Sequence, residues 1–242
     1  MTHAKRPSLT SDTKTIAVRV HGRYLIDARP DAVATLVGFH GYQENAAIHL
    51  EVLRRIAQGL PTVAAGAKVG PLNLISIQAL NRFYTRANAV VAGWMTSEDR
   101  ELAIADNIGY VAAVLAEVAG ASGITRPMIY AGFSQGVAMA YRAAAFVQRP
   151  CDGVIALAGD VPPDVAPVAT GLPRILLGRG RADKWYTEAK AAADLATLRG
   201  AGVTVAEHAF EGGHEWDESF VVRAAAFVDQ AIAASGAPAD DR

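Results

Sequence analysis

Residues 128–141 read MIYAGFSQGVAMAY, and this stretch determines how the rest of the sequence is interpreted. The segment 128–132 is apolar or small throughout, as in a buried strand, and the Ala-rich segment from residue 136 is typical of a helix. Between them, Gly132-Phe133-Ser134-Gln135-Gly136 places one serine between two glycines. Such glycines let a strand and a helix pass close together at a sharp turn that raises the serine hydroxyl above the sheet. We therefore predict that Ser134 is a nucleophile.

Two other interpretations of this turn need to be weighed. The serine can simply cap the following helix, and glycine-rich turns between a strand and a helix also bind phosphate. A phosphate-binding loop of the GxxxxGK[ST] type needs a lysine, and this turn has none. If Ser134 is a nucleophile, the backbone N–H of Gln135 lies at the positive end of the helix, where an oxyanion would form.

A serine hydroxyl becomes a good nucleophile only when a base takes its proton, so a histidine must reach it and a carboxylate must orient that histidine. His214 lies in EGGHEW, a glycine-rich loop after the last apolar run, and satisfies the chain order serine, acid, histidine. The other histidines lie near the N-terminus, inside predicted elements or before the serine: His3, His21, His40, His49 and His208. His214 is the predicted base.

The acid is expected at the end of a strand between the serine and the histidine. Asp183 follows the run RILLGRGRA, and Asp160 directly follows GVIALAG. We prefer Asp183, because the acid of such a site normally comes after the penultimate strand. The alternative for Asp183 is a solvated loop carboxylate among basic neighbours, namely Arg179, Arg181 and Lys184.

A second oxyanion donor is predicted in the sequence FHGYQEN, which follows the apolar run 34–40 and precedes a helical pattern. A His-Gly turn at this strand end lets the N–H of Tyr42 face the same oxygen as the N–H of Gln135. Two such donors stabilise a tetrahedral oxyanion, and losing one typically costs about 2.7–4 kcal/mol of activation free energy.

Aromatic residues in the loops suggest where a substrate would bind. The connection 80–97 is long, and long loops in compact domains are often binding elements. We expect Trp94 in this connection and Trp185 beside the acid loop to contact substrate. The equally good alternative is that these aromatics pack over the ends of the sheet.

Apolar runs that alternate with helical patterns predict one mostly parallel, eight-stranded sheet with helices on both faces. The runs are 14–20, 23–28, 34–40, 73–79, 128–132, 153–159, 174–178 and 203–210. Only His21-Gly22 separates the first two runs, which predicts an antiparallel hairpin at one edge of the sheet.

Helical patterns lie at 44–58, 98–119, 136–147, 186–199 and 217–234. We expect Thr96 or Ser97 to cap the longest helix and Gly120 to end it. Residues 14–234 are predicted to form a single domain, with flexible tails at 1–13 and 235–242.

The composition excludes several classes of protein. The chain has 242 residues, of which 51% are hydrophobic, and a single cysteine, Cys151, so it is no disulfide scaffold. A formal net charge of −1 favours neither nucleic acid nor an anionic membrane. We expect no membrane span and no secretory leader, and therefore a soluble cytoplasmic protein.

Five segments together resemble the carboxylesterase/phospholipase family of α/β-hydrolases, which includes acyl-protein thioesterases and lysophospholipases. FHGYQEN resembles the oxyanion loop HGxGD/EN of that family, AGFSQG its nucleophile elbow, and GVIALAGDVP its GVIALSGxLP stretch. LLGRGRAD resembles the acid loop, EGGHEW resembles the histidine loop GxGHE, and the resemblance spans about residues 33–230. It implies an α/β-hydrolase fold, with Ser134 as nucleophile, Asp183 as acid and His214 as base, and with Tyr42 and Gln135 as oxyanion donors.

The sequence departs from that family at a few positions near the predicted site. Gln43 stands where a glycine is usual, Arg179 where the family has histidine, and Asp160 where it has an uncharged residue. Trp185-Tyr186 replaces small or aliphatic residues, and Gly93-Trp94-Met95 is all that resembles the substrate loop of the family. These differences bear on substrate specificity more than on the three predicted catalytic residues.

The resemblance implies a serine hydrolase that cleaves carboxylic esters or thioesters through an acyl-enzyme, without a metal or organic cofactor. A metal site formed by His208, Glu211 and His214 is not expected, because no helical HExxH spacing brings them together. The alternatives are an acyltransferase or peptidase with the same triad, and a non-catalytic binding protein on the same scaffold. The expected partner is a small-molecule ester or thioester, and apolar surface around Trp94 would suit a homodimer or a lipid-facing mouth.

Overall fold

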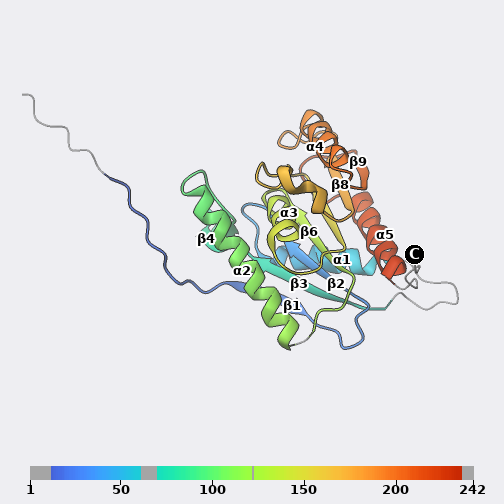
Figure 1. The fold of residues 1–242 in the computed structure, drawn as a ribbon, viewed down its shortest axis with the longest axis horizontal. Helices are drawn as coiled ribbons and strands as arrows, with labels where there is room; N and C mark the ends of the chain where they lie inside the picture. Colours follow the sequence, from blue (N-terminus) through green and yellow to red (C-terminus); the bar gives the residue numbers. More distant parts are fainter. Residues whose placement is uncertain (1–11, 61–69, 122, 236–242) are drawn as a thin grey trace, which may run out of the picture.

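The structure is a computed structural model that describes residues 12–60, 70–121 and 123–235 (Figure 1). Within these residues, seven strands form a single sheet in which all neighbours are parallel except the edge strand β1, which is antiparallel to β3. Across the sheet the strands are β1 (Arg23–Asp27), β3 (Leu72–Gln78), β2 (Ala34–Phe39), β6 (Met128–Phe133), β7 (Gly153–Leu157), β8 (Ile175–Gly180) and β9 (Val205–Phe210).

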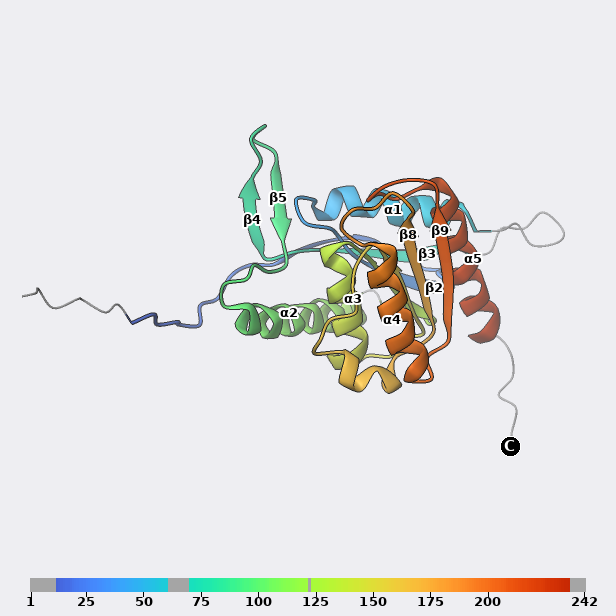
Figure 2. The same cartoon turned by 90° about the horizontal axis from the view of Figure 1, so that it is seen from above.

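Helices cover both faces of this sheet (Figure 2). One face carries α1 (Ala46–Gln58) and α5 (Glu218–Ser235), and the other carries α2 (Arg100–Ala121), α3 (Gln135–Phe146), α4 (Glu188–Gly200) and the short 3₁₀ helix η1 (Ala166–Gly171). Every residue of β2, β3, β6, β7 and β8 is buried, as expected for strands that are covered on both sides.

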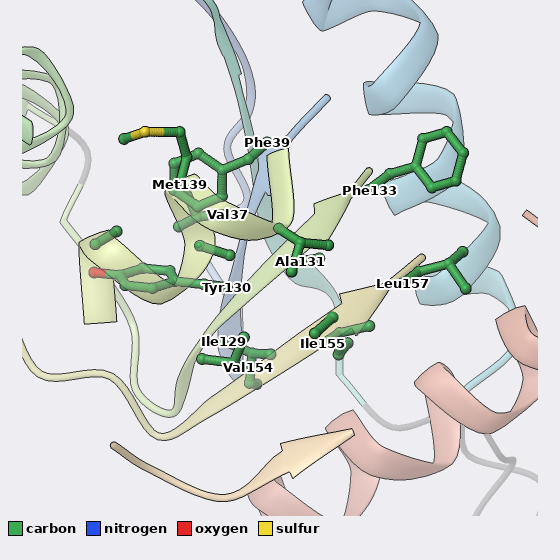
Figure 3. Packing of buried hydrophobic residues seen from close by; sticks show 14 of the residues in the cluster. Val37, Phe39, Ile129, Tyr130, Ala131, Phe133, Met139, Val154, Ile155 and Leu157 are labelled. Atoms are coloured by element: carbon green, nitrogen blue, oxygen red, sulfur yellow. The ribbon is translucent and has the colours of Figure 1, made fainter. Parts of the chain in front are cut away.

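The centre of the core lies around β6. Tyr130 of β6 packs beside Met139 of α3 on one face, whereas Phe133 points toward the opposite face (Figure 3). Alternate strand residues thus anchor both helical layers, and each fully buried large apolar side chain contributes about 1.5–3 kcal/mol to stability. This packing fixes the carboxyl end of β6, where Ser134 lies.

The hairpin predicted from 14–20 and 23–28 is wrong, and the main sheet has seven strands rather than eight. Residues 14–20 form no strand, and neither His21 nor Gly22 has the positive φ that a tight two-residue hairpin turn requires. The ring of Tyr110 instead packs on Gly22, its hydroxyl donates to the Arg23 carbonyl, and β1 pairs with the buried strand β3. The apolar side chains of this segment stay exposed: Ile16 (87%), Val18 (75%) and Val20 (62%).

The connection 80–97 is not one long loop. It contains β4 (Asn81–Tyr84) and β5 (Val90–Gly93), which form a separate two-stranded antiparallel sheet that projects from the body of the protein (Figure 2). Asn88 adopts a φ of 58° in the turn between them, a conformation that asparagine tolerates better than most residues.

The predicted ends of the longest helix also differ from the structure. The Thr96 hydroxyl accepts from the N–H of Glu98, ahead of α2, and the helix itself begins at Arg100. Gly120 does not end it, since α2 continues to Ala121. The tails predicted at 1–13 and 235–242 lie almost wholly outside the described residues.

Among the described helices, α2 is the one whose length and apolar composition would allow it to cross a membrane. Core helices of globular proteins pass the same test, and α2 packs against α3 with one side buried. Its buried residues are Ile104, Asn107, Val111, Val114, Leu115 and Val118.

An ion pair between a buried arginine and a partly exposed aspartate joins α3 to the segment before η1. The Arg142 side chain is fully buried, and its Nε and Nη2 atoms donate to the two oxygens of Asp164 at 2.8 and 2.7 Å. This hydrogen-bonded guanidinium lowers the pKa of Asp164. A buried guanidinium needs such a partner, because a charge left alone in the interior costs far more than the pair itself gains.

We predict that Asp164→Ala lowers the free energy of unfolding by about 3–5 kcal/mol, because it leaves the Arg142 guanidinium buried and unpaired. Urea unfolding followed by circular dichroism measures the change. The matched control is Glu207→Ala, which removes an ion pair with Arg199 whose side chains are about half exposed, and which should cost under about 1 kcal/mol. Equal losses in the two variants would contradict this role of Asp164.

Candidate active site

Ser134 occupies a sharp turn between β6 and α3. Its backbone has φ 52° and ψ −119°, a conformation that non-glycine residues rarely adopt. The Ser134 N–H donates to the Leu157 carbonyl of β7 at 2.9 Å, and the hydroxyl makes no capping bond to the helix. The helix-cap interpretation of this serine is therefore wrong. Its hydroxyl is free to contact residues of the loops at the carboxyl end of the sheet.

The two glycines around the serine make this turn sterically accessible. A Cβ on Gly132 would lie 2.6 Å from the Gly136 carbonyl oxygen, and a Cβ on Gly136 would lie 2.0 Å from the Phe39 carbonyl oxygen. Both distances are far inside van der Waals contact. The spacing of small residues in GFSQG is thus required by the close passage of α3 over β2 and β6.

The structure brings Ser134, His214 and Asp183 together through two hydrogen bonds. His214 Nε2 lies 2.7 Å from Ser134 Oγ, and His214 Nδ1 lies 2.8 Å from Asp183 Oδ2. The three residues follow β6, β9 and β8, so parallel strands deliver them to the same edge of the sheet. The Asp183 side chain is completely buried, whereas that of His214 is 24% exposed.

Backbone groups of its own loop orient the Asp183 carboxylate. Its Oδ1 atom accepts from the N–H groups of Trp185 at 2.8 Å and Tyr186 at 3.0 Å, which leaves Oδ2 directed at the imidazole. The acid and histidine loops are also joined, because the Ala182 N–H donates to the Gly212 carbonyl at 2.9 Å. Asp160, the other acid considered, pairs with Lys190 at 3.2 Å and makes no hydrogen bond to His214.

The loop after β2 presents one of the two predicted backbone donors. The N–H groups on either side of Tyr42 are engaged: that of Gly41 donates to Glu44 Oε2 at 2.7 Å, and that of Gln43 donates to the Ala92 carbonyl at 3.1 Å. Within the described part of the chain, neither the Tyr42 N–H nor the Gln135 N–H has an acceptor. Both remain available to a ligand oxygen.

Gln43 lies in this loop, at a position where a glycine is usual in the family that the sequence resembles. Its φ is 64°, which is the left-handed conformation that a glycine would adopt without strain, and its side chain is exposed.

The side chain of Gln135 fixes the segment after β5, since its Oε1 accepts from the Trp94 N–H at 2.7 Å and its Nε2 donates to the Met95 carbonyl at 2.8 Å. Sequence reasoning missed this second use of Gln135.

Comparison with known proteins gives a likeness in structure only. No family model and no curated protein matches the sequence. Solved structures do match: esterase PE8 has a TM-score of 0.66 at 21% identity, over 88% of this chain and 100% of that one. The Bacillus cereus carboxylesterase has a TM-score of 0.63 at 17% identity, over 87% of this chain and 94% of its own.

A third match is acyl-protein thioesterase 2 of Zea mays, with a TM-score of 0.62 at 17% identity over 88% of this chain and 100% of that one. The protein has the α/β-hydrolase fold. These neighbours are esterases and a thioesterase by name, which agrees with the family that the sequence segments resemble. At such low identity, the likeness describes the fold and not the substrate.

At the carboxyl ends of the strands, Ser134 and His214 line a hollow of about 310 Å³. Trp185 also lines it and is 75% exposed. Trp94 does not line the hollow, and the prediction that it contacts substrate is wrong. It is completely buried, its Nε1 donates to the His40 carbonyl at 2.8 Å, and its ring packs against Phe39.

Two histidines near the site are buried and structural. His40 Nε2 accepts from the Ala79 N–H at 3.0 Å and its Nδ1 lies 2.7 Å from the Gly41 carbonyl, so the ring is a neutral link beneath the Tyr42 loop. Burial lowers the pKa of His40 to about 4 and that of His49 to about 3. Neither is placed to accept a proton from Ser134, whose hydroxyl contacts His214.

These two histidines make folding sensitive to acid. Between pH about 6.5 and about 4, the unfolded chain protonates imidazoles that the folded chain keeps neutral, so the free energy of unfolding falls as the pH falls. Each histidine contributes up to about 1.4 kcal/mol per pH unit in this window. We expect urea unfolding between pH 7 and pH 4.5 to show a shallower loss of stability in His49→Gln than in the wild type. Identical slopes would contradict the burial of His49 in its neutral form.

Proposed function

We propose that the protein is a serine hydrolase that cleaves carboxylic esters or thioesters. One observation carries this proposal: the hydroxyl of a serine in a strained elbow lies 2.7 Å from His214 Nε2, and Nδ1 of the same ring lies 2.8 Å from a buried carboxylate. An orienting acid, a base and a nucleophile in this order are what nucleophilic acyl transfer needs.

In the acylation step, Ser134 Oγ attacks the acyl carbon while His214 Nε2 takes the hydroxyl proton. Asp183 holds the ring in the tautomer that has its proton on Nδ1, and it stabilises the imidazolium that forms. The carbonyl oxygen becomes an oxyanion that the free N–H groups of Tyr42 and Gln135 bind. The intermediate then expels the alcohol or thiol, which leaves with the proton from His214.

In the deacylation step, His214 takes a proton from a water molecule, and the resulting oxygen nucleophile attacks the ester that joins the acyl group to Ser134. The carboxylic acid leaves, and Ser134 Oγ recovers its proton from the imidazolium. No step of this sequence needs a metal or an organic cofactor. An alcohol or an amine in place of water would give acyl transfer, which product analysis with competing nucleophiles distinguishes from hydrolysis.

We predict that Ser134→Ala lowers kcat on 4-nitrophenyl butyrate by about 10⁴-fold or more, because no other group takes over the covalent step. Release of 4-nitrophenol at 405 nm, corrected for spontaneous hydrolysis, gives the rate.

The matched control is Ser219→Ala, which removes another serine hydroxyl that lies close to a histidine. Ser219 Oγ is 3.0 Å from His208 Nε2, but neither residue lines the hollow around Ser134. This control should keep wild-type activity. Full activity in Ser134→Ala would rule out the proposed mechanism, and complete inactivity of the wild type on a panel of esters and thioesters would favour a non-catalytic binding protein.

A further inference from the structure

The hollow around Ser134 and His214 is lined by charged as well as apolar side chains. Three ionic side chains line it: Arg100 at the start of α2, Asp160 after β7 and Lys190 of α4. Its volume of about 310 Å³ is at the lower end for small-molecule sites. Such walls offer charged partners to a substrate that carries a polar group.

The charges of this wall do not all cancel within it. Lys190 Nζ pairs with Asp160 at 3.2 Å, and these two side chains are about half exposed. Arg100 is exposed and, within the described residues, forms an ion pair with no carboxylate. Arg100 is therefore the cation of the wall that has no partner of its own.

Two further acids lie near these residues, and other groups already engage both. Asp164 accepts two hydrogen bonds from the guanidinium of the buried Arg142. Asp194 accepts from the Tyr186 hydroxyl at 2.9 Å and from the Val161 N–H at 3.1 Å, and burial raises its pKa. Neither acid lines the hollow. Arg100 helps to lower the pKa of Asp164, but within the described residues it forms no ion pair with that carboxylate or with Asp160.

We propose that this site prefers esters that carry a negatively charged group, a carboxylate or a phosphate, near the scissile bond, and that Arg100 determines this preference. The inference rests on the proposed function, because it names the substrate class of the same serine. A guanidinium offers parallel N–H donors that match the oxygens of either anion, and a charge-assisted bond of this kind discriminates strongly against a neutral isostere. Arg100 acts here on substrate binding and not on the proton transfers.

The test compares two pairs of esters that differ in charge. On the acyl side, 4-nitrophenyl hydrogen adipate is matched with 4-nitrophenyl hexanoate, which has the same chain length. On the alcohol side, 4-acetoxybenzoate, which carries a carboxylate, is matched with phenyl acetate. A third ester, 4-acetoxyphenyl phosphate, carries a phosphate in place of the carboxylate and is compared with the same neutral ester. Each kcat/KM is measured for the wild type, Arg100→Ala, Arg100→Lys and Arg86→Ala. Because every value is divided by that of the wild type, differences in intrinsic reactivity between the esters cancel.

We expect Arg100→Ala to lower kcat/KM about 10-fold for the anionic ester of at least one pair and less than about 2-fold for its neutral partner. Arg100→Lys, which keeps the charge but lacks the parallel N–H donors, should keep only part of the preference, and added salt should weaken the preference in the wild type. Arg86, an exposed arginine in the turn between β4 and β5, lies outside the hollow, so Arg86→Ala should change neither ester.

The results separate this inference from the function on which it rests. If neutral esters are cleaved by the wild type and not by Ser134→Ala, the proposed function stands whatever Arg100 does. An Arg100→Ala variant that affects charged and neutral esters equally, or affects neither, overturns the preference alone. A wild type that cleaves none of these esters overturns both.

Discussion

The strained backbone of Ser134 is the constraint on which the rest of the site depends. A residue at this φ and ψ costs about 1–3 kcal/mol, and it persists only where the surroundings determine it. Here the Ser134 N–H is bonded to β7, the strand before it is paired on both sides, and α3 begins at the next residue. Side chains at positions 132 and 136 would clash with the backbone of Gly136 and Phe39, so the turn needs a glycine at both positions. The cost of the turn is offset by the core packing around β6.

The parallel sheet then brings distant residues to this one turn. Asp183 and His214 come from the two strands beyond β7, and backbone hydrogen bonds between their loops hold the acid and the base in register. The Gln135 side chain forms hydrogen bonds with the segment after β5. The buried His40 supports the loop that presents the Tyr42 N–H. Hydrogen bonds thus hold the loops that present Tyr42, Asp183 and His214 at the ends of the strands.

Much of this arrangement could be predicted from the sequence, because its signals are local. GFSQG specifies a turn, apolar runs specify buried strands, and EGGHEW follows the last strand. The errors concern properties that depend on distant partners. The apolar run at 14–20 does not reveal that β1 pairs with β3 at the edge of the sheet. A tryptophan at the end of a strand does not reveal whether its side chain faces a cavity, so Trp94 was wrongly expected to contact substrate. Arg100 was missed because a helical pattern does not show that the first residue of α2 lines the same hollow as a serine 34 positions later in the sequence.

The central claim is that Asp183 and His214 together activate Ser134. Its most direct test is the rate at which a fluorophosphonate ester attaches to the protein, measured by intact-protein mass spectrometry and mapped by peptide sequencing. The account predicts one phosphonyl group, on Ser134, and a rate that falls by about 10³–10⁴-fold in Asp183→Asn while the same residue is labelled. Labelling of another residue, or an equal rate in the two proteins, would contradict it.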